Sequence, residues 1–418
     1  MGERADGLIQ KQLSGPKSGV ELGQKGACSL KDEYDFSVIL FAISCALAIV
    51  YTAIIFASLP LRRDVAAHRD YIVYWATGQQ LAHHGNPYDP AALKQLEREG
   101  GFTGGAAYFM RNTPWALPLA LPLGYMSAQA AALPWSLFML GLLVVSVRIL
   151  WRMFGSAGSR IDWLGYCFPP ALACVDIGQT SVILLFGLVL FLRFHKKRPF
   201  AAGTALCLCS IKPHLFLPFA LVLLLWIVVS RSYRILAGVV AAMLAGNAVT
   251  ACIDPSALSQ YVYYMRTSNT TREFTACLGD VLRDALHPSA EWLAFVPAML
   301  GSVWAVVYFW RKRHTWDWLE NGNPLMLVSL IVAPFGWIFD QTLAIPALLF
   351  AASRTSSRVL LSVLALIYIA IEVELLHFEP HSLAYLWIVL AWLVWYLFAR
   401  AYSDEAGAAP VSVSQSIT

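Results

Sequence analysis

The most regular feature of this sequence is a series of apolar runs that contain no charged residue and are separated by short polar gaps. None of the runs shows the alternation of apolar and polar positions that a membrane-spanning strand requires. In lipid the backbone must satisfy its own hydrogen bonds, and a helix does this within one segment. We therefore expect each run to be helical. The runs cover residues 36–61, 112–147, 163–175, 177–192, 199–211, 215–230, 235–253, 292–310, 321–339, 341–353, 359–371 and 382–399.

The lengths of these runs predict an irregular membrane domain. About 20 helical residues cross the hydrocarbon core of a bilayer. The runs 163–175 and 199–211 are shorter than this, and the run 112–147 is much longer. We expect the long run to be broken around 114–123 and the short runs to be re-entrant pieces covered by protein. The predicted fold is an all-α polytopic integral membrane protein with about 12 transmembrane or re-entrant helices and a structured first outer loop.

Composition supports a membrane protein and excludes two other classes. Apolar residues make up 58% of the 418 residues and charged residues 13%, whereas soluble domains carry roughly 25% charged residues. This excludes a cytosolic globular enzyme, and the 22 Phe, 17 Tyr and 15 Trp exclude a disordered chain. The eight cysteines include no CxxC pair and predict no zinc site. Cys252 and Cys277 bracket one loop and could form a disulfide, which spacing alone does not decide.

The basic residues predict how the chain is oriented. They cluster in every second gap between the apolar runs, and the positive-inside rule assigns these gaps to the cytoplasm. We expect a cytoplasmic tail over 1–35, a transmembrane domain over 36–400 with outer loops 60–113 and 254–291, and a cytoplasmic tail over 401–418. The protein would lie in the plasma (inner) membrane with its active site facing the periplasm or cell exterior. The clusters are Arg148 and Arg152; Arg193, Lys196, Lys197 and Arg198; Arg231 and Arg234; Arg311, Lys312 and Arg313; Arg354 and Arg358; and Arg400.

The outer segment 60–111 is expected to form a structured cap. Residues 71–81 have helical spacing with Tyr74 and Trp75 on one side. Such an aromatic face is typical of a helix that lies at the lipid surface. Turn-forming residues follow, and a second short polar helix is predicted over 91–99.

The sequence lacks the common motifs of nucleotide, metal and hydrolase chemistry. It contains no GxxxxGK[ST], no GxGxxG after a strand, no DxD, no HExxH and no GxSxG. We therefore predict no cofactor and no metal site. Polar residues instead mark the outer ends of the apolar runs, and ionisable groups at membrane depth are costly unless they are paired or hydrated. The residues that we expect around one shared polar cavity are Asp70, Arg111, Asn112, Asp176, Gln179, Lys212, His214, Arg266, Asp340 and Gln341.

Short blocks in a fixed order, between Asp70 and about Pro346, make this sequence similar to a known family. The blocks are residues 70–78, residues 86–89, Pro114 with Pro118, Pro122-Leu123, Gly178-Gln179, and Ala202-Gly203 through Lys212-Pro213. With these blocks the sequence resembles glycosyltransferase family 87, in the GT-C group of polyprenyl-phosphate-dependent mannosyltransferases. The resemblance implies a GT-C-like fold and an inverting transfer of a hexose, with mannose expected, from a polyprenyl-phosphate donor. The acceptor would be a lipid-linked or envelope glycan on the non-cytoplasmic face.

The resemblance also implies roles for individual residues. Asp70 matches the acidic residue of the first outer loop that acts as general base, and Lys212 would lie near the donor phosphate. Two departures from the family pattern are visible: an aromatic-Pro-Pro run is replaced by Arg111-Asn112-Thr113-Pro114, and a histidine is missing from residues 335–341. The further candidates are Arg111, His214 and Arg266 for the phosphate, and Tyr74, Gln179, Asp340 and Gln341 for the sugar or acceptor.

These residue types suit the implied chemistry. A sugar on a lipid phosphate is already activated, so neither a nucleotide nor a metal is strictly needed. A carboxylate such as Asp70 can accept the proton of the acceptor hydroxyl. Cations such as Lys212 can stabilise the charge that grows on the leaving phosphate. The expected partners are therefore the lipid donor, the acceptor and membrane lipids, and no nucleic acid.

Simpler interpretations remain open for several of these residues. Asp70 precedes a predicted helix and could serve as its N-cap. Lys212 could extend from a short helix towards the interface, and Arg111 could be an interfacial anchor. Asp340 could be a solvated turn residue, and His214 a polar residue at the end of a span.

Two other functions are also compatible with the sequence. A transporter or flippase of a lipid-linked sugar would need many spans and a polar cavity too. Transporters, however, tend to have repeated halves and sites near the bilayer midplane. No clear repeat relates residues 36–200 to 230–400, and the polar residues lie towards one face. A non-catalytic assembly protein is the third interpretation.

Overall fold

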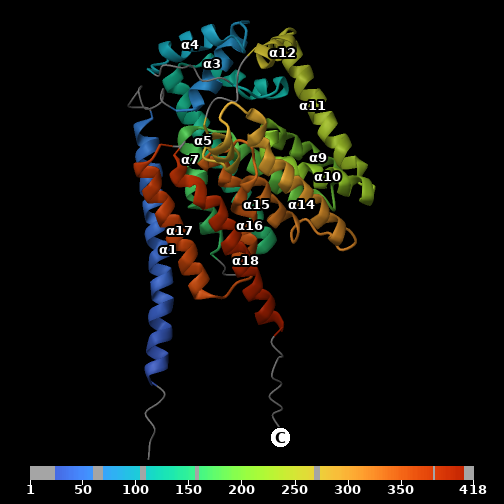
Figure 1. Ribbon diagram of the computed structural model, residues 1–418. Coiled ribbons are helices and arrows are strands. Elements are labelled where there is room, and N and C mark those ends of the chain that lie inside the picture. Colours follow the sequence, from blue (N-terminus) through green and yellow to red (C-terminus); the bar gives the residue numbers. More distant parts are fainter. Residues whose placement is uncertain are drawn as a thin grey trace, which may run out of the picture.

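The computed structural model describes residues 24–59, 69–103, 110–155, 160–267, 274–379 and 382–408. Helices are the only regular elements in these residues. The long helices stand side by side, and α3 (Tyr71–Ala82), α4 (Pro90–Glu99) and α12 (Ala257–Thr267) lie together at one end of them (Figure 1). An all-α membrane domain is thus confirmed as the coarse fold.

Seven helices in the described residues are long and apolar enough to cross a membrane. Three of them continue from a 3-10 turn: η4 (Pro213–Phe216), η5 (Glu291–Phe295) and η7 (Leu383–Tyr385). The predicted count of about 12 transmembrane or re-entrant helices is not confirmed; the other apolar helices are shorter than the roughly 20 residues that cross a bilayer. The seven are α1 (Gln24–Ser58), α5 (Ala128–Phe154), α10 (Leu217–Ser230), α11 (Tyr233–Ile253), α14 (Val296–Lys312), α17 (Arg358–His377) and α18 (Leu386–Ala408).

Shorter helices fill the interior of the bundle. All eight residues of α16 and ten of the fourteen residues of α8 are buried, including Leu349 and Leu184. Such pieces need not span the bilayer alone, because neighbouring helices cover them. The shorter elements are α6 (Asp162–Tyr166), α7 (Pro169–Ile177), α8 (Ser181–Phe194), α9 (Pro199–Leu206), η3 (Cys207–Ile211), α13 (Leu278–Leu286), α15 (Gly322–Ile331), η6 (Ile338–Ala344) and α16 (Ile345–Ala352).

The longest apolar run is broken where its prolines predict. Two 3-10 turns, η1 (Pro114–Leu119) and η2 (Leu121–Tyr125), precede α5. Proline removes a backbone donor and cannot continue a helical hydrogen-bond ladder. The run 112–147 therefore contains one crossing and a short folded-back segment.

Helix α3 is packed inside the protein, and its expected position at the lipid surface is wrong. Tyr71, Tyr74 and Trp75 are all buried. The Trp75 Nε1 donates to the Met126 carbonyl at 2.9 Å, so the indole faces protein rather than a membrane interface. An aromatic face fits a protein interior as well as an interface, because both offer apolar contact.

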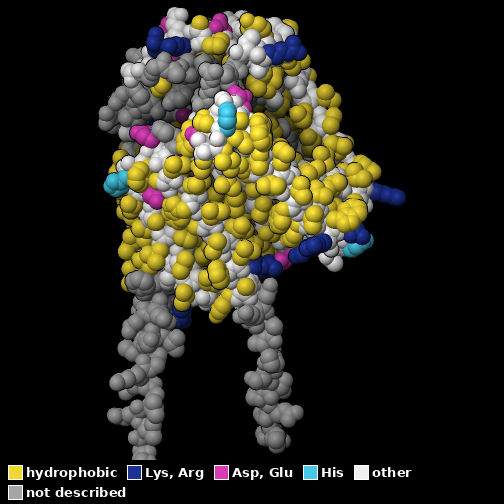
Figure 2. Space-filling view, viewed as in Figure 1, with side chains coloured by type: hydrophobic (Ala, Val, Ile, Leu, Met, Phe, Trp, Pro, Cys, Tyr) yellow, Lys and Arg dark blue, Asp and Glu magenta, His cyan; other side chains and the backbone are white. Residues whose placement is uncertain are grey.

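The outer surface has the pattern of a membrane protein. Apolar side chains cover most of the flank of the bundle in Figure 2, and most of the Lys and Arg side chains lie at its upper end and along its lower right edge. Leu244, Leu300 and Phe398 are largely exposed on long helices, where lipid can cover them. Figure 1 places the start of α1 and the end of α18 at the end opposite α3, α4 and α12.

The candidate disulfide is absent from the structure. Cys252 and Cys277 are both free thiols; the first is exposed on α11 and the second is buried. The Cys277 Sγ lies 3.3 Å from the Pro334 carbonyl oxygen instead.

Candidate active site

Asp70 is held by a glutamine from a distant part of the chain. It occupies the N-cap position of α3, but its side chain makes no capping hydrogen bond. Instead, the Gln179 Nε2 donates to the Asp70 Oδ2 at 2.6 Å. The Asp70 side chain is therefore oriented by Gln179 and not by the helix that it precedes.

A glycine turn places Gln179 beside Asp70. Gly178 ends α7 with φ at +80°, a region that favours glycine. A Cβ at this position would lie 2.4 Å from the Tyr71 Cβ, so a larger residue would also push against α3. The Gly178 carbonyl accepts a hydrogen bond from the Trp135 Nε1 at 2.8 Å. Gly178 permits the turn and the close packing that bring Gln179 to Asp70, which explains the Gly178-Gln179 block.

Tyr74 lies next to the same turn. Its hydroxyl is 3.5 Å from both the Gln179 Oε1 and the Thr180 Oγ1. Its ring stacks on Trp135 with centroids 5.3 Å apart. Burial raises the pKa of the Tyr74 phenol well above its usual range, so this hydroxyl stays protonated. It can therefore donate one hydrogen bond at neutral pH.

Lys212 and Asp340 form a buried ion pair that includes Ser181. The Lys212 Nζ lies 2.6 Å from the Asp340 Oδ1, and the side chains are 12% and 3% exposed. Lys212 also donates to the Ser181 Oγ at 3.3 Å, and Ser181 donates to Asp340. The other Asp340 oxygen accepts from the Trp337 backbone N–H at 3.0 Å. Asp340 is thus neither a solvated turn residue nor unpaired.

The two halves of the site are joined through one short segment, residues 179–181. Gln179 contacts Asp70, and Ser181, two residues later at the start of α8, contacts Lys212 and Asp340. Asp70 and Lys212 therefore belong to one polar cluster at one end of the helices. We call the residues Asp70, Tyr74, Gln179, Thr180, Ser181, Lys212 and Asp340 the polar cluster.

The segment that carries Arg111 is tied to the segment before Lys212. The Asn112 Nδ2 donates to the Ile211 carbonyl at 2.9 Å. The Asn112 carbonyl accepts from the Tyr88 hydroxyl at 3.0 Å. The hydrogen bond between Asn112 and Ile211 therefore joins the segment of Arg111 to the segment of Lys212.

Two other candidates border the polar cluster without joining its hydrogen bonds. His214 follows Lys212 by two residues, and its ring meets Phe335 edge-on with centroids 6.1 Å apart. The Gln341 Oε1 accepts from the Trp392 Nε1 at 2.8 Å, so this oxygen is engaged by α18.

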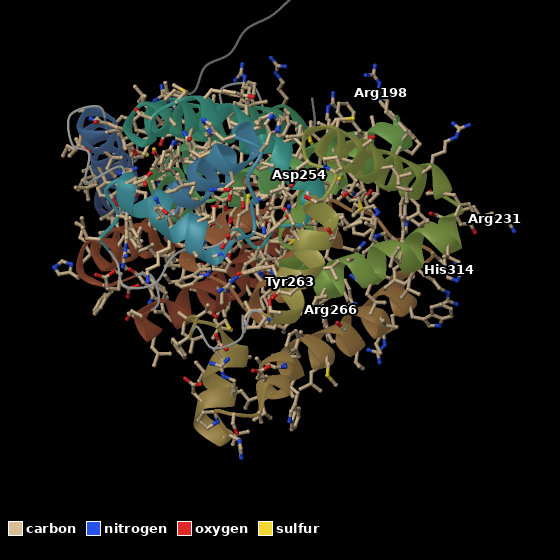
Figure 3. The ribbon with its side chains drawn as sticks, turned by 90° about the horizontal axis from the view of Figure 1, so that it is seen from above. Arg198, Arg231, Asp254, Tyr263, Arg266 and His314 are labelled. Carbon is tan, nitrogen blue, oxygen red and sulfur yellow. The ribbon has the colours of Figure 1, made fainter. Side chains whose placement is uncertain are left out.

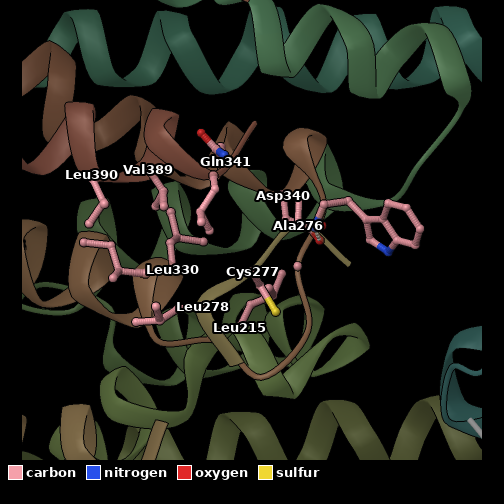
Figure 4. Close-up of a pocket in the computed structure, with 13 residues that line it drawn as sticks. Leu215, Ala276, Cys277, Leu278, Leu330, Asp340, Gln341, Val389 and Leu390 are labelled. Atoms are coloured by element: carbon pink, nitrogen blue, oxygen red, sulfur yellow. Dashed lines mark hydrogen bonds between the residues drawn. The ribbon is translucent and has the colours of Figure 1, made fainter. Parts of the chain in front are cut away.

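A hollow of about 80 Å³ lies beside Asp340 and Gln341. Figure 4 shows Leu330, Val389 and Leu390 on its wall with these two polar residues. Leu390 is also exposed on the flank of the bundle. The hollow therefore places an apolar wall between the polar cluster and the lipid-facing surface.

The structure does not bring Arg266 into the polar cluster. This residue lies in the last turn of α12 and is exposed. Figure 3 shows it near Tyr263, which is also exposed. The sequence does not show how far a basic residue in an outer loop lies from the other candidates.

A second buried ion pair adjoins the site, and sequence reasoning missed one of its members. Arg69 pairs with Asp176, which also accepts from the Tyr51 hydroxyl at 2.9 Å. Burial raises the pKa of the Asp176 carboxyl despite the Arg69 charge. Arg69 precedes Asp70, and Asp176 lies three residues before Gln179. The ion pair therefore holds the segment of Asp70 beside the segment of Gln179. The adjacent pair Arg69-Asp70 was the available sequence signal.

Thr180, Ser181 and Trp135 were also missed by sequence reasoning. A serine that begins an apolar helix ordinarily indicates a helix start, and a tryptophan in a span ordinarily indicates a core residue. Only the fold brings Ser181 to Asp340, which is 159 positions away.

Together, the helices and the polar cluster define a polytopic membrane protein with a polar site at one end of its bundle. The sequence model of glycosyltransferase family 87 matches residues 109–339, which is more than half of the chain. The chain belongs to this family and is a glycosyltransferase, an enzyme that uses a sugar donor and an acceptor. Comparisons with curated proteins and with solved structures gave no match. The matched region includes Arg111, Gln179, Lys212, His214 and Arg266; Asp70 and Tyr74 precede it, and Asp340 and Gln341 follow it.

Proposed function

We propose that this glycosyltransferase moves a hexose, with mannose expected, from a polyprenyl-phosphate donor to a lipid-linked or envelope glycan acceptor on the non-cytoplasmic face. One observation carries the proposal: a carboxylate and a lysine from distant segments meet through residues 179–181 at one end of a membrane-spanning bundle. The transfer needs a proton acceptor and a cation near one sugar phosphate.

Asp70 is the proposed general base. The acceptor hydroxyl oxygen attacks the anomeric carbon of the sugar while its proton passes to the Asp70 carboxylate. The bond between the anomeric carbon and the phosphate oxygen breaks, and its electron pair stays on the phosphate. A single displacement of this kind inverts the anomeric centre. Gln179 orients the carboxylate through its 2.6 Å hydrogen bond.

Lys212 is the proposed contact for the leaving phosphate. An ammonium group has three donors, and Ser181 and Asp340 accept two of them. The remaining N–H can bind a phosphate oxygen, where charge develops as the bond breaks. Arg111 and His214 lie on segments next to Lys212 and are the further proposed phosphate ligands. Tyr74, Asp340 and Gln341 are proposed to contact the sugar or acceptor.

The polyprenyl tail is proposed to leave through the hollow beside Asp340. Its wall carries Leu330, Val389 and Leu390, and such side chains suit an isoprenoid chain. Exposed Leu390 marks the side on which the tail would reach the bilayer.

A transfer assay on Asp70 tests this proposal. Purified full-length protein in lipid vesicles would receive polyprenyl-phosphate mannose labelled in the sugar, together with a membrane lipid extract as acceptor. Asp70→Asn should lower the transfer rate at least about hundredfold, because general base catalysis contributes that much or more. Its thermal unfolding temperature should stay close to that of the parent protein.

The matched control is Asp284→Asn, an Asp→Asn change on α13 at a carboxylate that is about half exposed and pairs with Arg283. It should leave the transfer rate unchanged. Retained turnover in Asp70→Asn would remove Asp70 from the mechanism. Efficient transfer from a nucleotide sugar without the lipid donor would contradict the proposed donor class.

A further inference from the structure

A second polar hollow lies at the far end of the helices that carry the polar cluster. It measures about 420 Å³ and is lined by His195, Lys196, Arg231, Arg234 and three tryptophans, among others. Helix α8 runs from Ser181 to Phe194, and its 14 residues place His195 about 20 Å from the polar cluster. The two sites therefore cannot share one small ligand.

The position of this hollow corresponds to a membrane surface. Arg231 and Ser232 are the two residues between the candidate spans Pro213–Ser230 and Tyr233–Ile253. In the view from above, Arg231 and His314 lie at one edge of the molecule (Figure 3). Val228 and Tyr233 on either side are exposed and apolar, as lipid-facing residues are. The hollow thus opens where lipid head groups meet the protein.

Three of the residues that line the hollow have a ring nitrogen that lacks a partner. The ring nitrogens Nε1 of Trp316, Nε1 of Trp318 and Nε2 of His195 are buried and make no hydrogen bond within the described parts of the chain. Trp318 and His195 are more than nine-tenths buried. A buried polar group without a partner costs stability, so a ligand that supplies the missing partners would be stabilising.

These nitrogens differ in what they require from a ligand. The tryptophan N–H groups need acceptors. The His195 Nδ1 lies 3.0 Å from the Leu192 carbonyl and must donate to it, and burial lowers the pKa of the ring. The neutral ring then presents its Nε2 as an acceptor. A matching ligand carries both acceptor oxygens and a hydroxyl.

The charge at the rim favours an anion. Lys196 pairs with Asp317 at 2.6 Å, which balances one positive charge. Arg231 and Arg234 are exposed and form no ion pair with any other residue that the structure describes. The rim therefore keeps two positive charges. Basic pockets between membrane helices bind the head groups of anionic lipids.

We propose that this hollow binds the phosphate of an anionic phospholipid with a hydroxyl-bearing head group, such as phosphatidylglycerol, in the leaflet opposite the polar cluster. The phosphate oxygens accept from Arg231, Arg234 and the tryptophan N–H groups. A head-group hydroxyl donates to the His195 Nε2, and the acyl chains lie along the exposed apolar side of α10. This site is separate from the donor site and does not depend on the proposed reaction.

Lipid binding to the purified full-length protein tests the proposal. The protein would be taken from vesicles of phosphatidylcholine with phosphatidylglycerol, and bound lipid measured by native mass spectrometry. Arg231→Gln/Arg234→Gln should weaken phosphatidylglycerol binding about 25-fold, because each basic residue near an anionic surface contributes about fivefold. The control Arg193→Gln/Arg311→Gln removes two exposed charges outside the hollow and should leave binding unchanged.

Trp316→Phe tests whether binding depends on the hollow itself or only on its positive charge, because this variant loses an N–H group and no charge. It should weaken binding about fivefold, the value of one hydrogen bond. Inorganic phosphate, added in neutral detergent without lipid, identifies the source of the anion. Stabilisation by phosphate alone, equal to that by the lipid, would overturn the lipid assignment in favour of free phosphate. Equal losses in both arginine pairs, or no preference for phosphatidylglycerol over phosphatidylcholine, would overturn the site.

Discussion

The ion pair between Lys212 and Asp340 gives the clearest test at a single position. Both side chains are almost fully buried, so removing one partner leaves an uncompensated charge. Lys212→Met should therefore lower the free energy of unfolding by about 3–5 kcal/mol. In activity assays it should raise the KM for the lipid donor more than the KM for the acceptor.

A double variant separates stability from function at this pair. Lys212→Met/Asp340→Asn removes both charges and should recover most of the lost stability, because a buried pair is often replaceable as a unit. Thermal unfolding and donor KM would be measured on both variants. Recovery of donor use together with stability would show that Lys212 has only a folding role.

Five of the seven residues of the polar cluster were candidates from the sequence, whereas their contacts were not predictable. Alternating basic gaps placed Asp70, Gln179, Lys212 and Asp340 at one face, because topology follows from charge. The Lys212 contact with Asp340 spans 128 positions and has no local signature. The pairing of Gln341 with Trp392 likewise depends on where α18 packs, and no pattern near either residue indicates it.

Helix α3 contains Tyr74 and follows Asp70, and it packs closely on η2. A Cβ on Gly78 would lie 2.2 Å from the Ala120 carbonyl oxygen. Gly78→Ala should therefore destabilise the protein by about 1–3 kcal/mol, the usual cost of overpacking. The shift of α3 should also displace Asp70 and Tyr74 and lower the transfer rate. Thermal unfolding and the labelled-sugar assay would measure the two effects.

Gly141→Ala is the matched control for this change. Gly141 lies in α5, and a Cβ there would meet nothing within 4 Å. Alanine is favoured over glycine in a helix by up to about 1 kcal/mol, so this variant should be neutral or slightly more stable. Equal destabilisation by both substitutions would mean that the contact between α3 and η2 is not the cause.

Elements were predictable where proline or charge marks their ends. The break at 114–125 followed from Pro114, Pro118 and Pro122, and α4 followed from its polar pattern. The burial of α3 was not predictable, because lipid and a protein interior select the same apolar side chains. The short central helices posed the same difficulty: a run of apolar residues indicates burial without showing what covers it.

The orientation of the whole molecule remains a prediction that the arrangement of elements makes testable. The start of α1 and the end of α18 lie at one end of the bundle, and α4 and α12 at the other (Figure 1). The basic gaps predict that the first end is cytoplasmic. The polar cluster would then face the periplasm or cell exterior, where a lipid-linked sugar can be used.

Labelling of introduced cysteines with a membrane-impermeant maleimide tests this orientation. Cys252 is exposed, so the background would be Cys28→Ser/Cys252→Ser. Gln95→Cys on α4 should react in intact cells, because it is exposed on the predicted outer end. His314→Cys, exposed beyond the end of α14, should react only after the membrane is permeabilised. The opposite pattern would place the polar cluster in the cytoplasm, and the transfer of a sugar to an outer acceptor would then require a separate flipping step.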